Sequence, residues 1–83
     1  MITSLEVLLA TVLQIPATTI TDDLAMKDVE AWDSLKHMEL ILSVEKAFGL
    51  ELTFDEIVAM QSVHEIKRVL TQRGVRSEDG PER

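Results

Sequence analysis

Apolar residues recur at spacings of three and four in three stretches of this 83-residue chain, and this pattern restricts the possible folds most strongly. Such spacing places apolar side chains along one side of an α-helix, which must then be buried against another element. The first stretch predicts a helix over residues 4–14, which Pro16 ends because the residue before a proline avoids helical angles. Thr3 and Glu6 are spaced as a capping box at its start.

The middle stretch predicts the longest helix, over residues 34–48. Asp33 and Ser34 are both residue types that cap helix N-termini, and Gly49 suits the left-handed position that follows a helix C-terminus. The helix therefore has a defined start and end. Its expected core face consists of Leu40, Ile41, Val44, Ala47 and Phe48.

Two more helices are predicted in the second half of the chain, a short one over residues 54–59 and another over 63–73 that Gly74 ends. Their predicted capping boxes are Thr53 with Glu56 and Ser62 with Glu65. The apolar stripe of the last helix is Val63, Ile66, Val69 and Leu70. The fold class is thus all-α: a four-helix bundle with three major helices, a short third helix and a long first loop.

The first loop, residues 15–33, is rich in Thr and Asp and has no sustained period. A loop of this length in a small domain is commonly packed by its own side chains or carries function. Its apolar residues are isolated, and we expect them to anchor it to the helices. They are Ile20, Leu24, Met26, Val29 and Trp32. The folded domain is predicted to cover residues 1–75, followed by a charged, disordered tail over 76–83.

Composition narrows the range of functions. A chain of this length can form one core but not a core and a deep substrate cleft, so an enzyme is not expected. The absence of cysteine excludes disulfides, thiolate metal sites and cysteine nucleophiles. Fifteen acidic and eight basic residues give a net charge of -7, which disfavours nucleic acid and favours partners that present Lys and Arg. Neither a membrane-spanning run nor a signal peptide is recognisable, so we expect a cytoplasmic protein.

The longest predicted helix has a second apolar side. Leu35, Met38 and Leu42 fall nearly opposite the core face, where a small helical domain has no second core to receive them. With Glu39 and Lys46 at their rim, they are predicted to form an exposed surface that binds a partner. The alternative is that the long first loop folds over these three residues and buries them.

Ser34 lies at the start of the same helix, where unpaired backbone N–H groups and the helix dipole favour an anion such as a phosphate ester. The alternative is that Ser34, or Asp33, only caps the helix. His37 follows within one turn, but residues at a helix start lack the enclosure that a nucleophile and its base require. We expect His37 at the surface or packed against the loop, with contact to a phosphate or partner as the alternative.

The segment around Ser34 reads WDSLKHMEL, and it resembles the attachment motif of carrier proteins in fatty-acid, polyketide and nonribosomal-peptide assembly, an Asp-Ser-Leu at the start of the second helix. Here the motif is Asp33, Ser34 and Leu35. The resemblance extends through TDDLAMKD before the motif and ELILSVEKAFGLEL and MQSVHEI after it, over about residues 1–74. Trp32 and His37 are more similar to standalone carriers of polyketide or aminoacyl type.

The resemblance implies that a phosphopantetheinyl transferase uses coenzyme A and magnesium to attach 4′-phosphopantetheine to Ser34. The arm then provides the thiol that the sequence lacks, and it holds acyl or aminoacyl groups as thioesters. The resemblance also implies a monomeric carrier that serves a loading ligase and downstream synthase or transferase enzymes. Asp33 would help the transferase, and the surface read by client enzymes would comprise Leu35, Met38, Glu39, Leu42 and Lys46. The competing hypothesis is a helical protein-interaction module that is never modified.

Overall fold

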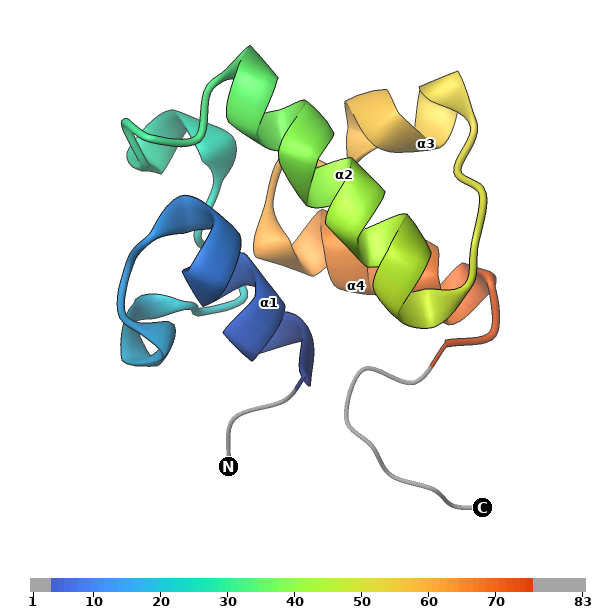
Figure 1. Cartoon of the computed structure of the whole chain (residues 1–83), viewed down its shortest axis with the longest axis horizontal. Coiled ribbons are helices and arrows are strands. Elements are labelled where there is room, and N and C mark those ends of the chain that lie inside the picture. Colours follow the sequence, from blue (N-terminus) through green and yellow to red (C-terminus); the bar gives the residue numbers. More distant parts are fainter. Residues whose placement is uncertain (1–3, 76–83) are drawn as a thin grey trace.

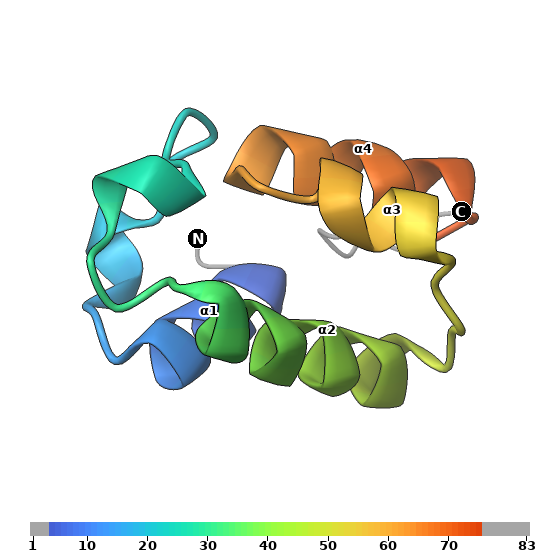
Figure 2. The same ribbon diagram turned by 90° about the horizontal axis from the view of Figure 1, so that it is seen from above.

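The computed structural model describes residues 4–75 as an all-α domain. Its four α-helices are α1 (Ser4–Leu13), α2 (Ser34–Phe48), α3 (Phe54–Ala59) and α4 (Val63–Gln72). Helices α1 and α2 lie together in one layer, and α3 and α4 lie in the other (Figures 1 and 2). The predicted four-helix bundle with a short third helix is confirmed. Within residues 4–75, no helix is long and apolar enough to cross a membrane.

The helix ends follow the capping residues closely. Helices α2 and α3 have the predicted bounds, and Gly49 adopts the expected left-handed conformation with φ 67°. Helix α1 ends one residue earlier than predicted because Gln14 turns left-handed, with φ 60°. The N-cap at Ser62 is confirmed, but the predicted capping box with Glu65 was wrong. The Glu65 carboxylate would have to accept from the N–H of Ser62, and it instead pairs with Arg68 over 2.7 Å. Thr3 and the predicted tail 76–83 lie outside the described residues.

The core lies between the two layers and takes residues from all the long helices. Leu40, Ile41 and Val44 of α2 are buried in it as predicted, and Phe48 is half-buried. Ala47 is exposed, so its assignment to the core face was wrong. It follows Leu40 by seven residues, and a straight helix rotates a residue at that spacing by ~20°, which moves Ala47 out of the stripe. The apolar stripe of α4 is buried throughout, at Val63, Ile66, Val69 and Leu70.

The first loop is anchored to the helices, as predicted. It contains two short 3-10 turns, Ala17–Thr19 and Met26–Asp28, and it buries Ile20 and Trp32 in the core. Backbone hydrogen bonds attach it to the start of α4: Met26 N donates to Gln61 O over 2.8 Å, and Val63 N donates to Leu24 O over 2.9 Å. The loop therefore lies beside α4 and has a fixed path toward the start of α2.

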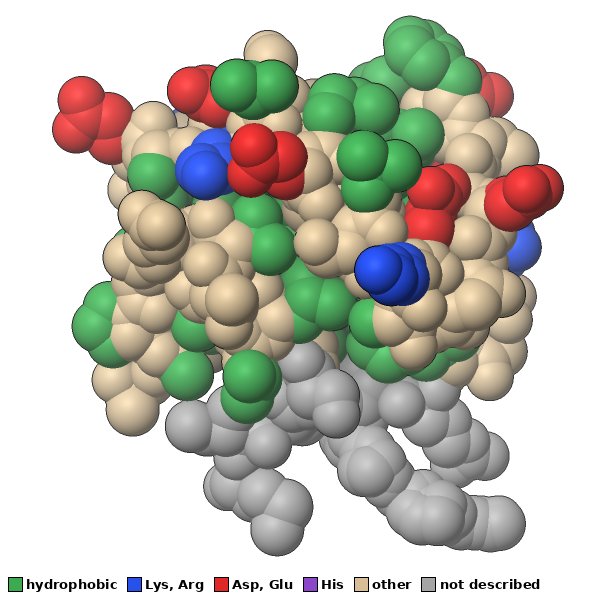
Figure 3. All heavy atoms as spheres, viewed as in Figure 1, with side chains coloured by type: hydrophobic (Ala, Val, Ile, Leu, Met, Phe, Trp, Pro, Cys, Tyr) green, Lys and Arg blue, Asp and Glu red, His purple; other side chains and the backbone are tan. Residues whose placement is uncertain are grey.

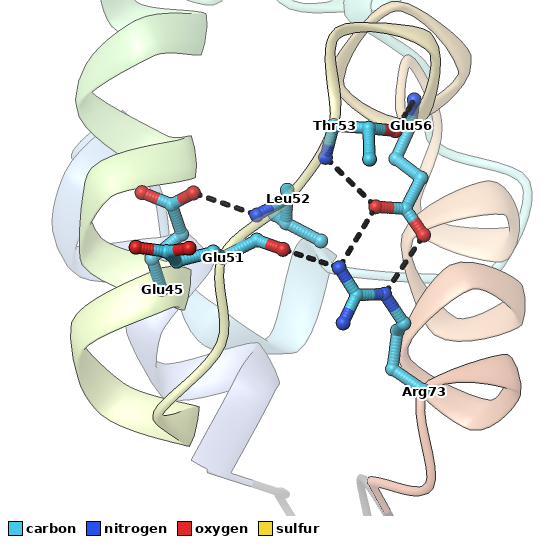
Figure 4. A network of polar contacts seen from close by, with 6 residues as sticks. All are labelled: Glu45, Glu51, Leu52, Thr53, Glu56 and Arg73. Carbon is cyan, nitrogen blue, oxygen red and sulfur yellow. Dashed lines mark hydrogen bonds and ion pairs between the residues drawn. The ribbon is translucent and has the colours of Figure 1, made fainter.

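A polar network fastens the connection between α2 and α3 (Figure 4). Arg73, just after α4, donates from Nε to Glu56 Oε2 over 2.9 Å and from Nη2 to the carbonyl of Glu51. Glu56 also accepts from the N–H of Thr53 over 2.9 Å, which completes the capping box of α3. The hydrogen bond from Arg73 is the main reason that the pKa of Glu56 is lowered to about 2. Thus α3 is held to α4 at its N-terminal end by a charge-assisted bond.

Glu56 should make the stability of the fold depend on pH in the acid range. Its folded pKa lies below the unfolded value, so the stabilisation is complete above the unfolded pKa of 4.5 and is lost as pH falls toward about 2. In Glu56→Gln this contribution should be absent at every pH. We expect the free energy of unfolding, measured by urea titration at pH 7, 4.5, 3 and 2, to fall less steeply in Glu56→Gln than in wild type. Parallel pH profiles for the two proteins would contradict this assignment.

Candidate functional site

Ser34 is the first residue of α2, and its side chain is exposed. The N-cap is Asp33, whose Oδ1 accepts a hydrogen bond from the N–H of Lys36 over 2.9 Å. Because the carboxylate performs the capping, the hydroxyl of Ser34 is left without a hydrogen-bond partner among residues 4–75. The alternative that Ser34 serves only as the cap is therefore wrong, and its oxygen is accessible for chemistry.

The surroundings of Ser34 suit a covalently bound phosphate. The hydroxyl lies at the positive end of a helix of fifteen residues, where N–H groups of the first turn lack intrahelical acceptors. The nearest basic side chain along the helix, Lys36, is paired with Glu39 over 3.2 Å and is partly exposed. A phosphodiester on Ser34 would thus lie near the positive end of α2 and be exposed to solvent.

His37 is buried beneath this helix start, so the alternative that placed it at the surface is wrong and packing against the loop is confirmed. The indole Nε1–H of Trp32 donates to His37 Nδ1 over 3.0 Å, and the two rings stack with centroids 6.1 Å apart. The other ring nitrogen, Nε2, lies 2.9 Å from the carbonyl oxygen of Ile57. Both nitrogens are therefore engaged, and His37 cannot serve as a general base for Ser34 in this arrangement.

The second apolar side of α2 is exposed, and the first loop does not cover it. Sequence reasoning missed that α3 continues this side: Phe54, at 77% exposure, and Val58 are also exposed. Apolar side chains gather over α2 and α3 on the face shown in Figure 3. We call this set the apolar surface; it comprises Leu35, Met38, Leu42, Phe54 and Val58. The signal for the two missed residues is weak, because six helical residues show no clear period.

The predicted site residues thus lie along the outer side of one helix. Asp33 and Ser34 occupy its start, and Glu39 and Lys46 are exposed farther along it. No group of three or more His, Cys, Asp or Glu residues between Ser4 and Val75 is arranged to hold a metal ion. An exposed hydroxyl beside the apolar surface is suited to covalent modification and to docking of a partner rather than to enclosing a substrate.

Comparison with known proteins identifies the family. The family model described as "Phosphopantetheine attachment site" matches residues 4–70 of this chain. The chain belongs to the phosphopantetheine-attachment family. It is also similar to the acyl carrier protein of Onion yellows phytoplasma (strain OY-M), with 32% identity over 68 residues that cover 82% of this chain and 90% of that protein.

Members of the phosphopantetheine-attachment family are carrier proteins, not catalysts, and their cofactor is covalently attached 4′-phosphopantetheine. The resemblance noted in the sequence is therefore confirmed at the level of the family. The match runs from the first residue of α1 into α4, so it includes residues from all four helices. Membership of the family does not distinguish an acyl from an aminoacyl cargo.

Proposed function

We propose that this family member carries its 4′-phosphopantetheine on Ser34 and uses it to present acyl or aminoacyl groups to separate enzymes. The observation that supports this most directly is the exposed hydroxyl of Ser34, which the cap at Asp33 leaves without a partner in residues 4–75. The arm supplies a terminal thiol that can hold a cargo as a thioester, which suits a chain without cysteine.

The chemistry at Ser34 requires only an accessible nucleophile. In a reaction catalysed by a phosphopantetheinyl transferase, the hydroxyl oxygen attacks the phosphorus of the coenzyme A pyrophosphate that bears pantetheine. The hydroxyl loses its proton, the bridging P–O bond breaks, adenosine 3′,5′-bisphosphate leaves, and a phosphodiester forms on Ser34. Asp33 holds the first turn of α2 in place through the N–H of Lys36, and this fixes the backbone position of the neighbouring Ser34. The helix dipole then favours the phosphodiester that results.

This proposal is tested by incubating the unmodified protein with coenzyme A, magnesium and a broad-specificity phosphopantetheinyl transferase. Intact mass spectrometry should show the addition of one arm, and fragmentation should place it on the segment that contains Ser34. A protein that remains unmodified with several such transferases would instead support the competing hypothesis of an unmodified interaction module.

The apolar surface is the region that we propose partner enzymes contact. Its α2 part, Leu35, Met38 and Leu42, lies on the same helix as Ser34, so an enzyme that reaches the arm also meets these side chains. Glu39 and Lys46 give the rim charges of both signs, so recognition here depends on apolar contact with charges at the edge. The proposed partners are the transferase, a loading ligase and downstream synthase or transferase enzymes.

Replacing Met38 by serine should weaken these contacts without unfolding the protein. We expect the KM of the phosphopantetheinyl transferase for the unmodified protein to rise about three- to tenfold, the loss typical of a moderate interface contact. Val7→Ser is the matched control, since Val7 is also exposed, at 51% against 46% for Met38, but lies on α1. Both variants should change the free energy of unfolding by less than ~1 kcal/mol. An equal rise in KM for both variants would argue against a localised docking surface.

A further inference from the structure

A side chain of α2 caps the C-terminal end of α3. The carbonyl groups in the last turn of a helix lack intrahelical partners, and Ile57 O lies in the last turn of α3. Its backbone contact from Met60 N is long, at 3.3 Å, whereas His37 Nε2 lies 2.9 Å away. His37 is three residues after Ser34, so the first turn of α2 is joined directly to α3.

Trp32 determines which nitrogen of His37 can donate. An indole N–H is a donor only, so His37 Nδ1 must accept from it across the 3.0 Å contact. In the neutral ring the proton then lies on Nε2, which is the nitrogen that faces Ile57 O. Trp32, in the first loop, therefore donates to His37, and His37 donates to the Ile57 carbonyl of α3.

Helix α3 needs this support because it has only six residues, and so short a helix is not stable by itself. Its N-terminal end is held by the capping box of Thr53 and by Arg73. Its C-terminal end is held by His37. These attachments fix where α3 presents Phe54 and Val58, the part of the apolar surface that does not lie on α2.

We propose that His37 is a positioning residue that, with Trp32, holds α3 in register with the start of α2, so that partner enzymes meet Ser34 and the apolar surface as one rigid unit. The hydrogen-bond chain Trp32–His37–Ile57 is the physical link. The Trp32 and His37 side chains in this chain are shielded from water, because both are buried. The part of this proposal that concerns partner enzymes rests on the proposed function. The hydrogen-bond chain within the protein is independent of that function.

The link is tested first without any enzyme. In wild type, the ¹⁵N shifts of the His37 ring should report a proton on Nε2 and none on Nδ1. Trp32→Phe keeps an aromatic ring but removes the donor, so Nδ1 can become protonated and Nε2 would then present a lone pair to Ile57 O. We expect hydrogen exchange of the Ile57 and Met60 amides to accelerate about three- to tenfold, the effect of one lost hydrogen bond. Leu9→Val on α1 controls for a general loss of stability.

The consequence for partners is then measured with the phosphopantetheinyl transferase and coenzyme A. Trp32→Phe should raise the KM for the unmodified protein about three- to tenfold and leave kcat nearly unchanged, because Ser34 itself is untouched. His37→Phe should have the same effect, and the double variant should be no worse than either single variant.

The proposal is overturned if the proton is found on Nδ1 in wild type, or if Trp32→Phe and Leu9→Val accelerate exchange in α3 equally. It is also overturned if KM is unchanged in a Trp32→Phe protein whose α3 exchanges faster. Failure of the transferase to modify wild type at all would refute the proposed function instead, and the ring shifts and the exchange rates would still decide whether the link exists.

Discussion

Replacement of Ser34 by alanine is expected to abolish attachment of the phosphopantetheine arm. The transferase would find no hydroxyl at the start of α2, and no other side chain there can replace it as an oxygen nucleophile of the same geometry. The expected result in intact mass spectrometry is no added mass after an incubation that modifies wild type completely. The free energy of unfolding should change by less than ~0.5 kcal/mol, because the exposed hydroxyl does not cap the helix.

Ser43 provides the matched control for this experiment. It is the other serine of α2, it is half-buried, and it lies away from the start of the helix. Ser43→Ala should therefore be modified at the wild-type rate. Addition of an arm to Ser34→Ala, or loss of modification in Ser43→Ala, would show that the attachment residue has been assigned to the wrong serine.

Leucine-to-alanine replacements two residues apart on α2 should differ sharply in their effect on stability. Leu40 is 0% exposed and lies in the core, whereas Leu42 is 62% exposed on the opposite side of the helix. Leu40→Ala should lower the free energy of unfolding by about 2–5 kcal/mol, through lost burial and the cavity that remains. Leu42→Ala should change it by less than ~0.5 kcal/mol. Chemical denaturation of the two variants measures the difference.

The order of the two variants should reverse when partner binding is measured, with Leu42→Ala the more affected. Leu42→Ala should weaken recognition by the transferase or a client enzyme, while the folded fraction of Leu40→Ala should bind normally. Similar losses of stability in both variants would contradict the assignment of a core side and an exposed side to α2, and with it the apolar surface.

Features encoded by local sequence were predictable. Thr53 and Gly49 act on backbone groups within a few residues of themselves, so the bounds of α2 and α3 could be assigned from short patterns. The exposed hydroxyl of Ser34 and the exposed side of α2 also follow from helical geometry and from the motif. Ala47 marks the limit of this reasoning, since small rotations accumulate along a helix.

Features that depend on distant pairs could not be derived in this way. The bond between Arg73 and Glu56 joins residues seventeen apart, and the contact between His37 and Ile57 joins residues twenty apart. No periodicity or capping rule links such positions, and a lone histidine beside a motif serine resembles a surface residue. Phe54 and Val58 were missed for a related reason: their exposure depends on how α3 is oriented against α4.

Asp33 caps α2 and Ser34 does not, and this matters for a protein that is modified after it folds. One residue secures the backbone at the start of α2, and its neighbour is free to be altered. Attachment of a prosthetic group to Ser34, as proposed, would therefore break none of the hydrogen bonds described within residues 4–75. If the arm is attached to Ser34 as proposed, we therefore expect the modified and unmodified proteins to share the same helical architecture.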